Sequence, residues 1–184
     1  MTDYRGQMKV LIRSISFLFM SVMFCTGVQA DETIAQRYVE DARLIGEARM
    51  KVLLWDVFDA RLYASGERFD RTKPFALSLS YLRELRGHSI VETTISEMSR
   101  QGRFSPSELR SWEGQLARLI DDVDTDTTIT GVRDENGHTL FYRDGQALGK
   151  ITDTRFTGGF FDIWLGDRTS RPAFTRQLLG TANS

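Results

Sequence analysis

FFDIWLG, at residues 160–166, is the stretch of the sequence that is most informative about the fold. Four of its large apolar side chains recur at intervals of three and four residues, which places them along one side of a helix. These are Phe160, Phe161, Ile163 and Trp164. Such a stripe is typical of a helix that is buried against a larger element. Gly166 follows directly, and we expect the helix to end there.

A second helix is predicted a few residues later, in the C-terminal part of the chain. Pro172 suits the first turn of a helix, because the N–H group that proline lacks would have no partner there. Ser170 or Thr169, just before the proline, would act as the N-cap. We expect this helix to end at Gly180.

The middle of the chain contains segments in which apolar and polar residues alternate, as they do in β-strands that are buried on one face. Between residues 48 and 63 the alternation changes phase at Asp56, which indicates one long strand with a bend or a bulge. Further strands are predicted at residues 75–81, 127–132, 139–142 and 147–151.

Two helices are predicted between these strands, and each begins with a capping box, in which a serine and the third helical residue bond to each other's backbone. The boxes are Ser89-Ile90-Val91-Glu92 and Ser105-Pro106-Ser107-Glu108. The order of strands, a helix pair, a strand meander and further helices contains no βαβ unit. It predicts the α+β class, with an antiparallel β-sheet covered by segregated helices.

The first 30 residues have the three parts of a secretory signal peptide. Basic residues come first, an apolar segment spans residues 15–24, and Val28-Gln29-Ala30 forms a cleavage site with small residues at its ends. The apolar segment is short for a membrane span, which needs roughly 20 residues, and an uncleaved N-terminal anchor is the alternative. We predict a signal peptide at residues 1–30 and one domain at residues 31–184. After cleavage near Ala30 the protein would be periplasmic or secreted.

The composition argues against several kinds of partner. The formal net charge is −1, so bulk charge would not hold a nucleic acid or an anionic membrane. Cys25 lies within the predicted signal peptide, and His88 and His138 have no partners at metal-ligand spacing. We predict no metal, no cofactor, no nucleic-acid partner and, after cleavage, no integral membrane segment.

Cations and hydroxyl groups at the ends of apolar strands are the candidate functional groups. They belong to Arg49, Tyr63, Tyr81 and Arg83. A guanidinium group is always charged and its planar fork matches a carboxylate. At the mouth of an apolar cleft, beside a tyrosine hydroxyl, it would bind an acidic head group while the ligand's tail is buried. The alternative is that the arginines form surface ion pairs and the tyrosines belong to the core.

Four segments, in their order and spacing, resemble the bacterial chalcone isomerase-like family. They are Asp59–Tyr63, Leu77–Arg83, Phe141–Gly145 and the FFDIWLG segment. The resemblance covers nearly all of residues 31–184. It implies the chalcone isomerase fold, an open-faced β-sandwich in which a sheet and helices surround an apolar cleft. The family includes isomerases, which close the phenol of a chalcone onto its enone, and non-catalytic fatty-acid binders.

The resemblance also implies roles for individual residues. Arg49 matches the strand arginine of the isomerases, and Thr169 or Ser170 matches their C-terminal threonine or serine. Phe58 falls at the strand threonine and Thr94 near the helix asparagine, and the tyrosine before that helix has no counterpart. Without these groups the water network that activates the phenol is not assembled in the same way. The resemblance therefore implies the binding branch of the family, in which an arginine and a tyrosine hold a fatty-acid carboxylate.

The sequence thus favours an exported, non-catalytic protein that binds a small apolar or amphipathic ligand, such as a fatty acid, in a cleft between sheet and helices. We expect no catalytic residues. The candidate ligand-binding residues are Arg49, Phe58, Tyr63, Tyr81, Arg83, Thr94, Thr169 and Ser170. Two alternatives stay open. One is an intramolecular lyase or isomerase that acts on a chalcone-like or other enone metabolite, and the other is an envelope interaction module with a closed cleft.

Overall fold

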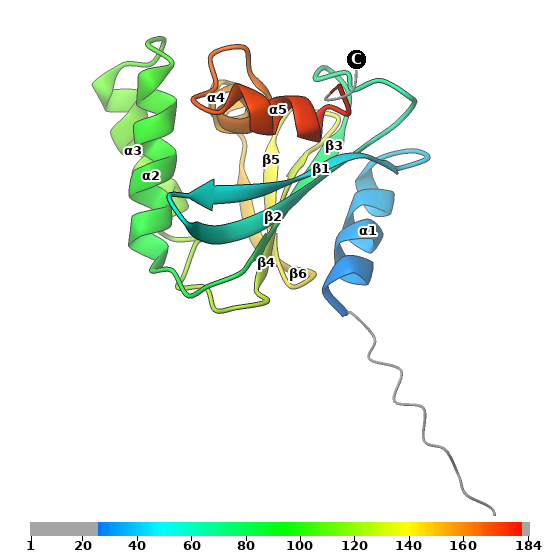
Figure 1. Cartoon of the computed structure of the whole chain (residues 1–184). Helices are drawn as coiled ribbons and strands as arrows, with labels where there is room; N and C mark the ends of the chain where they lie inside the picture. Colours follow the sequence, from blue (N-terminus) through cyan, green and yellow to red (C-terminus); the bar gives the residue numbers. More distant parts are fainter. Residues whose placement is uncertain (1–25, 182–184) are drawn as a thin grey trace, which may run out of the picture.

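The computed structural model describes residues 26–181. Within this part of the chain, six strands form one antiparallel sheet in which every strand pairs with its neighbour in sequence (Figure 1). The strands are β1 (Arg43–Val52), β2 (Trp55–Ala64), β3 (Phe75–Tyr81), β4 (Thr128–Arg133), β5 (Thr139–Arg143) and β6 (Gln146–Ile151). The four strands expected after residue 74 are therefore confirmed to within two residues at each end.

The described helices cover both faces of the sheet (Figure 1). The helix-side core lies between one face and α2 (Gly87–Arg100), α3 (Pro106–Leu116), α4 (Thr154–Leu165) and α5 (Pro172–Leu178). The opposite face carries α1 (Thr26–Tyr38), whose Ile34 and Ala35 pack against Tyr63 and Tyr142. No helix within residues 26–181 is long and apolar enough to cross a membrane.

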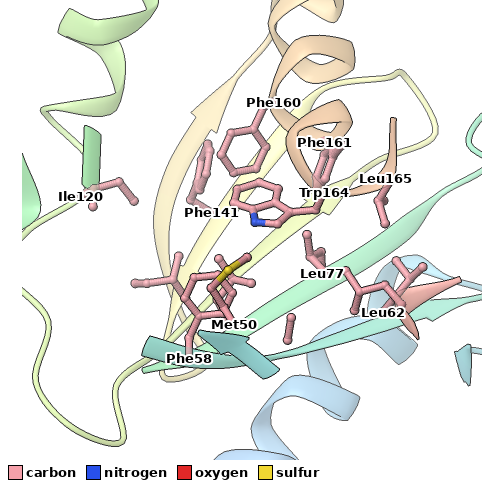
Figure 2. Packing of buried hydrophobic residues seen from close by; sticks show 14 of the residues in the cluster. Met50, Phe58, Leu62, Leu77, Ile120, Phe141, Phe160, Phe161, Trp164 and Leu165 are labelled. Atoms are coloured by element: carbon pink, nitrogen blue, oxygen red, sulfur yellow. The ribbon is translucent and has the colours of Figure 1, made fainter. Parts of the chain in front are cut away.

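Aromatic rings of α4 pack into the helix-side core, as the FFDIWLG segment predicts. Phe160 stacks on Phe156 and meets Phe161 and Trp164 edge to face, with ring centroids 5.1–5.5 Å apart. Phe141, from β5, lies 5.3 Å from Phe160 (Figure 2). Edge-to-face pairs of this kind add to the stabilisation that burial alone supplies. The predicted end of α4 at Gly166 is confirmed.

The expectation of one strand between residues 48 and 63 is wrong, although the expected irregularity at Asp56 is present, because the pairing register shifts between Met50–Phe58 and Lys51–Asp56. β1 and β2 are separate strands joined by a two-residue turn, Leu53-Leu54, with Val52 opposite Trp55. The turn lacks the glycine or asparagine that usually marks such a hairpin, and Leu53 itself takes the left-handed conformation, with φ of 56°. Because an apolar turn looks like a continuation of the strand, the change of phase at Asp56 was the only visible signal.

The predicted helix starts are partly confirmed. The capping box of α3 is present, with Ser105 and Glu108 bonding to each other's backbone. The box at Ser89 is wrong, because α2 begins earlier, at Gly87, whose N–H donates to the Asp122 carboxylate at 2.9 Å. A carboxylate from a distant segment thus replaces the local cap.

The last helix differs from the expectation at its start. Arg171 is the N-cap residue of α5, and no side chain caps this end, so the assignment of Ser170 or Thr169 as the N-cap is wrong. Pro172 is in the first turn as expected, and the end expected at Gly180 is confirmed, because Leu178 is the last helical residue and Gly180 follows the C-cap with φ of 67°. The Thr169 hydroxyl instead accepts a hydrogen bond from the N–H of Arg171 at 3.1 Å, within the α4–α5 loop.

The predicted signal peptide falls mostly outside the described residues. Residues 1–25 lie before the first residue that the structure describes, and α1 begins at Thr26. The predicted cleavage site after Ala30 is therefore within the span of this helix.

Candidate ligand-binding site

The innermost candidate residues are Phe58 and Tyr81, which lie opposite each other on β2 and β3. Their ring centroids are 5.8 Å apart and the ring planes meet at 70°. Phe58 also contacts Phe174 of α5 edge to face, with centroids 6.2 Å apart. Both candidates point into the helix-side core because side chains alternate along a strand, and the apolar positions of β2 and β3 share that face. The structure brings these two predicted residues together.

The Tyr81 hydroxyl is the unusual polar group of this core. Tyr81 is 4% exposed, and within residues 26–181 its hydroxyl makes no hydrogen bond. Burial raises the pKa of Tyr81, so the phenol stays neutral and can donate a hydrogen bond. Buried hydroxyl groups normally have a partner, since an unsatisfied one costs free energy. The phenol is therefore available to the polar end of a ligand.

Arg83 lies just beyond this pair, at the end of β3. Its guanidinium carbon is 4.8 Å from the centroid of the Trp55 ring, a cation–π contact. Phe58 on β2 and Tyr81 on β3 are register partners. The two residues of the cation–π contact lie close to them in sequence, since Trp55 is three residues before Phe58 and Arg83 is two residues after Tyr81. The cation and the buried phenol are thus successive groups along the same pair of strands.

Arg49 lies on the other face of the sheet from the helix-side core. Its neighbours Ala48 and Met50 point into that core, whereas Arg49 binds Asp59 through two hydrogen bonds of 2.6 and 2.7 Å. A third bond, of 3.3 Å, reaches Asp56. These carboxylates raise the pKa of Arg49 further above its usual range. The structure does not bring Arg49 together with Tyr81.

The remaining candidates are dispersed over the fold. Tyr63 is 4% exposed and packs beneath α1, on the face opposite Tyr81. The Thr94 hydroxyl donates to the carbonyl oxygen of Ile90 within α2, at 2.8 Å. Thr169 donates to a carbonyl of α4, and Ser170 follows it in the α4–α5 loop. No single site contains all eight predicted residues.

Surface hollows are described at three other places. One of about 440 Å³ lies between α2 and α3, and one of about 400 Å³ lies between the end of α1 and the start of β1. The third, of about 350 Å³, is lined by charged and amide side chains, namely Arg71, Gln101, Arg103, Asp162, Asp167 and Arg168. None of the three is lined by Phe58 or Tyr81.

The third hollow reveals residues that sequence reasoning missed. Asp162, within the FFDIWLG segment, accepts hydrogen bonds from Arg71 at 3.1 Å and from Arg103 at 2.6 Å. Both arginines are in loops without any periodic pattern, so their convergence had no sequence signal. The ion pairs join the β2–β3 loop and the α2–α3 loop to α4. Within residues 26–181 no cluster of side chains suited to a metal ion is found.

The fold has a counterpart among solved structures. No protein-family model matches the chain, and no curated protein sequence resembles it significantly. A fatty-acid binding protein of Arabidopsis thaliana is similar in structure, with a TM-score of 0.59 over 79% of this chain and 92% of that chain. The two sequences are 16% identical, a level at which the likeness shows the fold alone. The predicted α+β fold of the chalcone isomerase-like type, an antiparallel sheet covered by helices, is confirmed.

Proposed function

We propose that the protein is a non-catalytic binder of an amphipathic apolar ligand, such as a fatty acid, held in the helix-side core. The observation that carries the proposal is the buried Tyr81 hydroxyl, which has no hydrogen-bond partner within the described residues and is surrounded by apolar side chains. A ligand carboxylate would accept its hydrogen bond. The fold shared with a fatty-acid binding protein supports the same class of ligand.

Residual exposure indicates where the ligand would enter. Met50 and Phe58 are each 9% exposed and Trp164 is 8% exposed, whereas Leu62 and Phe156 are at 0%. The core is therefore sealed around Leu62 and Phe156 and retains contact with solvent toward the β1–β2 hairpin. Because the rings fill this layer, we infer that Phe58 and Met50 turn aside when the ligand's tail enters.

Arg83 would supply the cation that the acidic head group needs. It stands beside the entry, held by its contact with the Trp55 ring rather than by a carboxylate. No salt bridge of Arg83 is found within the described residues, so the guanidinium is available. Arg49, by contrast, already has two carboxylate partners on the opposite face. We therefore assign the head group to Tyr81 and Arg83.

The same residues favour binding over isomerisation. Phe58 offers a ring edge where an isomerase of this fold would present a hydroxyl, and the Thr94 hydroxyl is already bonded to Ile90. Neither is placed to activate a phenol.

We also propose that residues 1–30 direct export and are removed near Ala30. The mass of the recovered protein tests this directly, since it would begin at Asp31.

Isothermal titration with dodecanoate tests the binding proposal. We expect Tyr81→Phe to weaken binding about 10- to 100-fold, because a hydrogen bond to a charged group contributes about 1.5–3 kcal/mol. Tyr142→Phe is the matched control, since Tyr142 is equally buried but packs against α1 on the other face. Equal affinities for wild type and Tyr81→Phe, or the absence of heat with any fatty acid, would refute the proposal.

A further inference from the structure

The turn between β1 and β2 exposes four consecutive apolar residues, which we call the hairpin tip. Val52 is 44% exposed, Leu53 90%, Leu54 95% and Trp55 61%. Figure 1 shows the turn at the end of the hairpin, where the arrow of β1 meets the start of β2. Exposed apolar residues usually occur singly, and a contiguous group of them marks a surface that contacts something apolar.

The backbone of the hairpin tip makes the exposure more unusual. Leu53 has φ of 56°, a left-handed conformation that is unfavourable for a residue with a side chain. Asparagine or glycine would adopt it more easily and would also suit water. Leucine at this position is therefore unfavourable both in its backbone conformation and in the exposure of its side chain to water. A strained, exposed apolar residue is best accounted for by an interaction that buries it.

Cations surround the hairpin tip. Lys51 precedes it with a 63% exposed side chain and pairs with Asp56 at 3.2 Å. Arg83 lies over the Trp55 ring, and Arg171 donates to the carbonyl oxygen of Lys51 at 3.2 Å. Within residues 26–181 neither Arg83 nor Arg171 forms a salt bridge. The tip therefore has a local positive excess, although the whole chain carries a net charge of −1.

We propose that the hairpin tip docks on the surface of an anionic lipid bilayer. Leu53 and Leu54 would enter the boundary between head groups and acyl chains, and Trp55 would lie at head-group level, where amphipathic rings are favoured. Lys51, Arg83 and Arg171 would then face lipid phosphates. Apolar insertion together with charge attraction is the usual basis of reversible interfacial binding.

The size and shape of the tip favour this occupant over a second copy of the chain. A stable protein interface buries roughly 800 Å² per partner and uses about 20–30 residues a side. The hairpin tip offers four residues on a two-residue turn. A bilayer needs no complementary pocket, so a narrow apolar projection suffices. The proposal goes beyond ligand binding and stands whether or not the helix-side core accepts a fatty acid.

Fluorescence of Trp55 on vesicles tests the proposal locally. Trp112 is 1% exposed and Trp164 8%, so the difference between wild type and Trp55→Phe isolates the exposed ring. With phosphatidylglycerol vesicles we expect the Trp55 emission to shift to shorter wavelength. Lipids brominated on the acyl chains should quench it. Residues 1–30 are the same in every variant, so a difference between variants reports on the tip itself.

Substitutions in the tip complete the test. The double change L53S/L54S should lower the vesicle-bound fraction of Trp55 at least about tenfold, because two buried leucines are lost. Leu44→Ser is the matched control, since Leu44 is 50% exposed on the same strand but outside the tip, and it should behave as wild type. Arg171→Gln should weaken binding to phosphatidylglycerol but not to phosphatidylcholine, and added salt should do the same.

Three results would overturn the proposal. The first is unquenched Trp55 in the wild type, and the second is equal binding by L53S/L54S. The third is a wild-type dimer in sedimentation equilibrium that L53S/L54S converts to a monomer without any lipid-dependent quenching. That last result would assign the hairpin tip to contact between copies of the chain.

Discussion

Tyr38 and Tyr142 share a hydrogen bond through their hydroxyl groups beneath α1, whereas the equally buried Tyr81 on the other face of the sheet has no such partner within the described residues. Burial, together with this bond, raises the pKa of Tyr142 to about 12. The sheet thus carries one phenol that is hydrogen-bonded to another side chain and one that we propose binds a ligand. This contrast leads to opposite expectations for the removal of the two hydroxyl groups.

Tyr142→Phe should destabilise the ligand-free protein, and Tyr81→Phe should not. The first change leaves the Tyr38 hydroxyl without its partner, at a cost of about 0.5–1.5 kcal/mol. The second removes a buried hydroxyl that has no partner, so the free energy of unfolding should stay the same or rise. Urea titrations of the three proteins measure this. A clear loss of stability in Tyr81→Phe would mean that its phenol has a structural role.

Arg83→Ala should weaken dodecanoate binding, while Arg49→Ala should leave the affinity unchanged. Arg83 lies over the Trp55 ring, beside the entry that we propose for the ligand, and Arg49 pairs with Asp59 on the other face. A guanidinium–carboxylate bond of about 1.5–3 kcal/mol corresponds to roughly 10- to 100-fold in affinity. Titration calorimetry of both variants compares them directly. If Arg49→Ala weakened binding and Arg83→Ala did not, the head group would be bound by Arg49 instead.

Gly46→Ala should separate α5 from β1. A Cβ atom at Gly46 would lie 2.4 Å from the Gln177 carbonyl oxygen and 2.6 Å from that of Leu178. Both are backbone atoms, so the helix must move, and overpacking of this kind costs roughly 1–3 kcal/mol. Gly114→Ala is the control, because nothing lies within 4 Å of that site and alanine favours α3. Thermal unfolding should show a lower Tm for the first variant and an equal or higher Tm for the second.

The capping box of α3 should make stability depend on pH in the acidic range. Hydrogen bonds from the backbone and side chain of Ser105 lower the pKa of Glu108. A lowered pKa in the folded protein contributes stability above the unfolded value, about 4.3, and that contribution is lost as pH falls through the folded value. The difference in urea midpoint between wild type and Glu108→Gln should therefore shrink as pH is lowered from about 6 to about 3. A difference that is constant over this range would contradict the assignment.

Much of the fold could be predicted because its signals are local. Alternation of Phe75, Leu77, Leu79 and Tyr81 predicts a strand with these side chains on one buried face, and the structure confirms this, although the other face of β3 is buried as well. The buried stripe of FFDIWLG and the α3 capping box are likewise properties of neighbouring residues. The start of α2 was missed because its cap, Asp122, lies 35 residues away from Gly87.

The site was harder to predict because the face of a strand depends on its register. A shift of one residue moves every side chain to the other face. Arg49 was matched to the strand arginine through the resemblance, and the structure puts its neighbours Ala48 and Met50 on the helix side instead. Tyr81 was placed by the alternation of apolar and polar residues along its own strand, which fixes the face of the sheet on which its side chain lies. The hairpin tip had a signal, the run Val52-Leu53-Leu54-Trp55, but an apolar run predicts a buried strand before it predicts an exposed turn.

The close contact between Gly46 on the first strand and Leu178 in the last helix has a consequence for how the chain folds. Each strand pairs with the strand before it, so the sheet can assemble progressively as the polypeptide emerges, and the longest connection is the one between β3 and β4, which contains α2 and α3. β1, however, is an edge strand, and it receives its covering helix only when residues near 178 are available. Until then its apolar positions and unpaired edge are open to other chains. Deletion of the last ten or so residues should therefore promote aggregation during synthesis more than it lowers the stability of protein that has already folded.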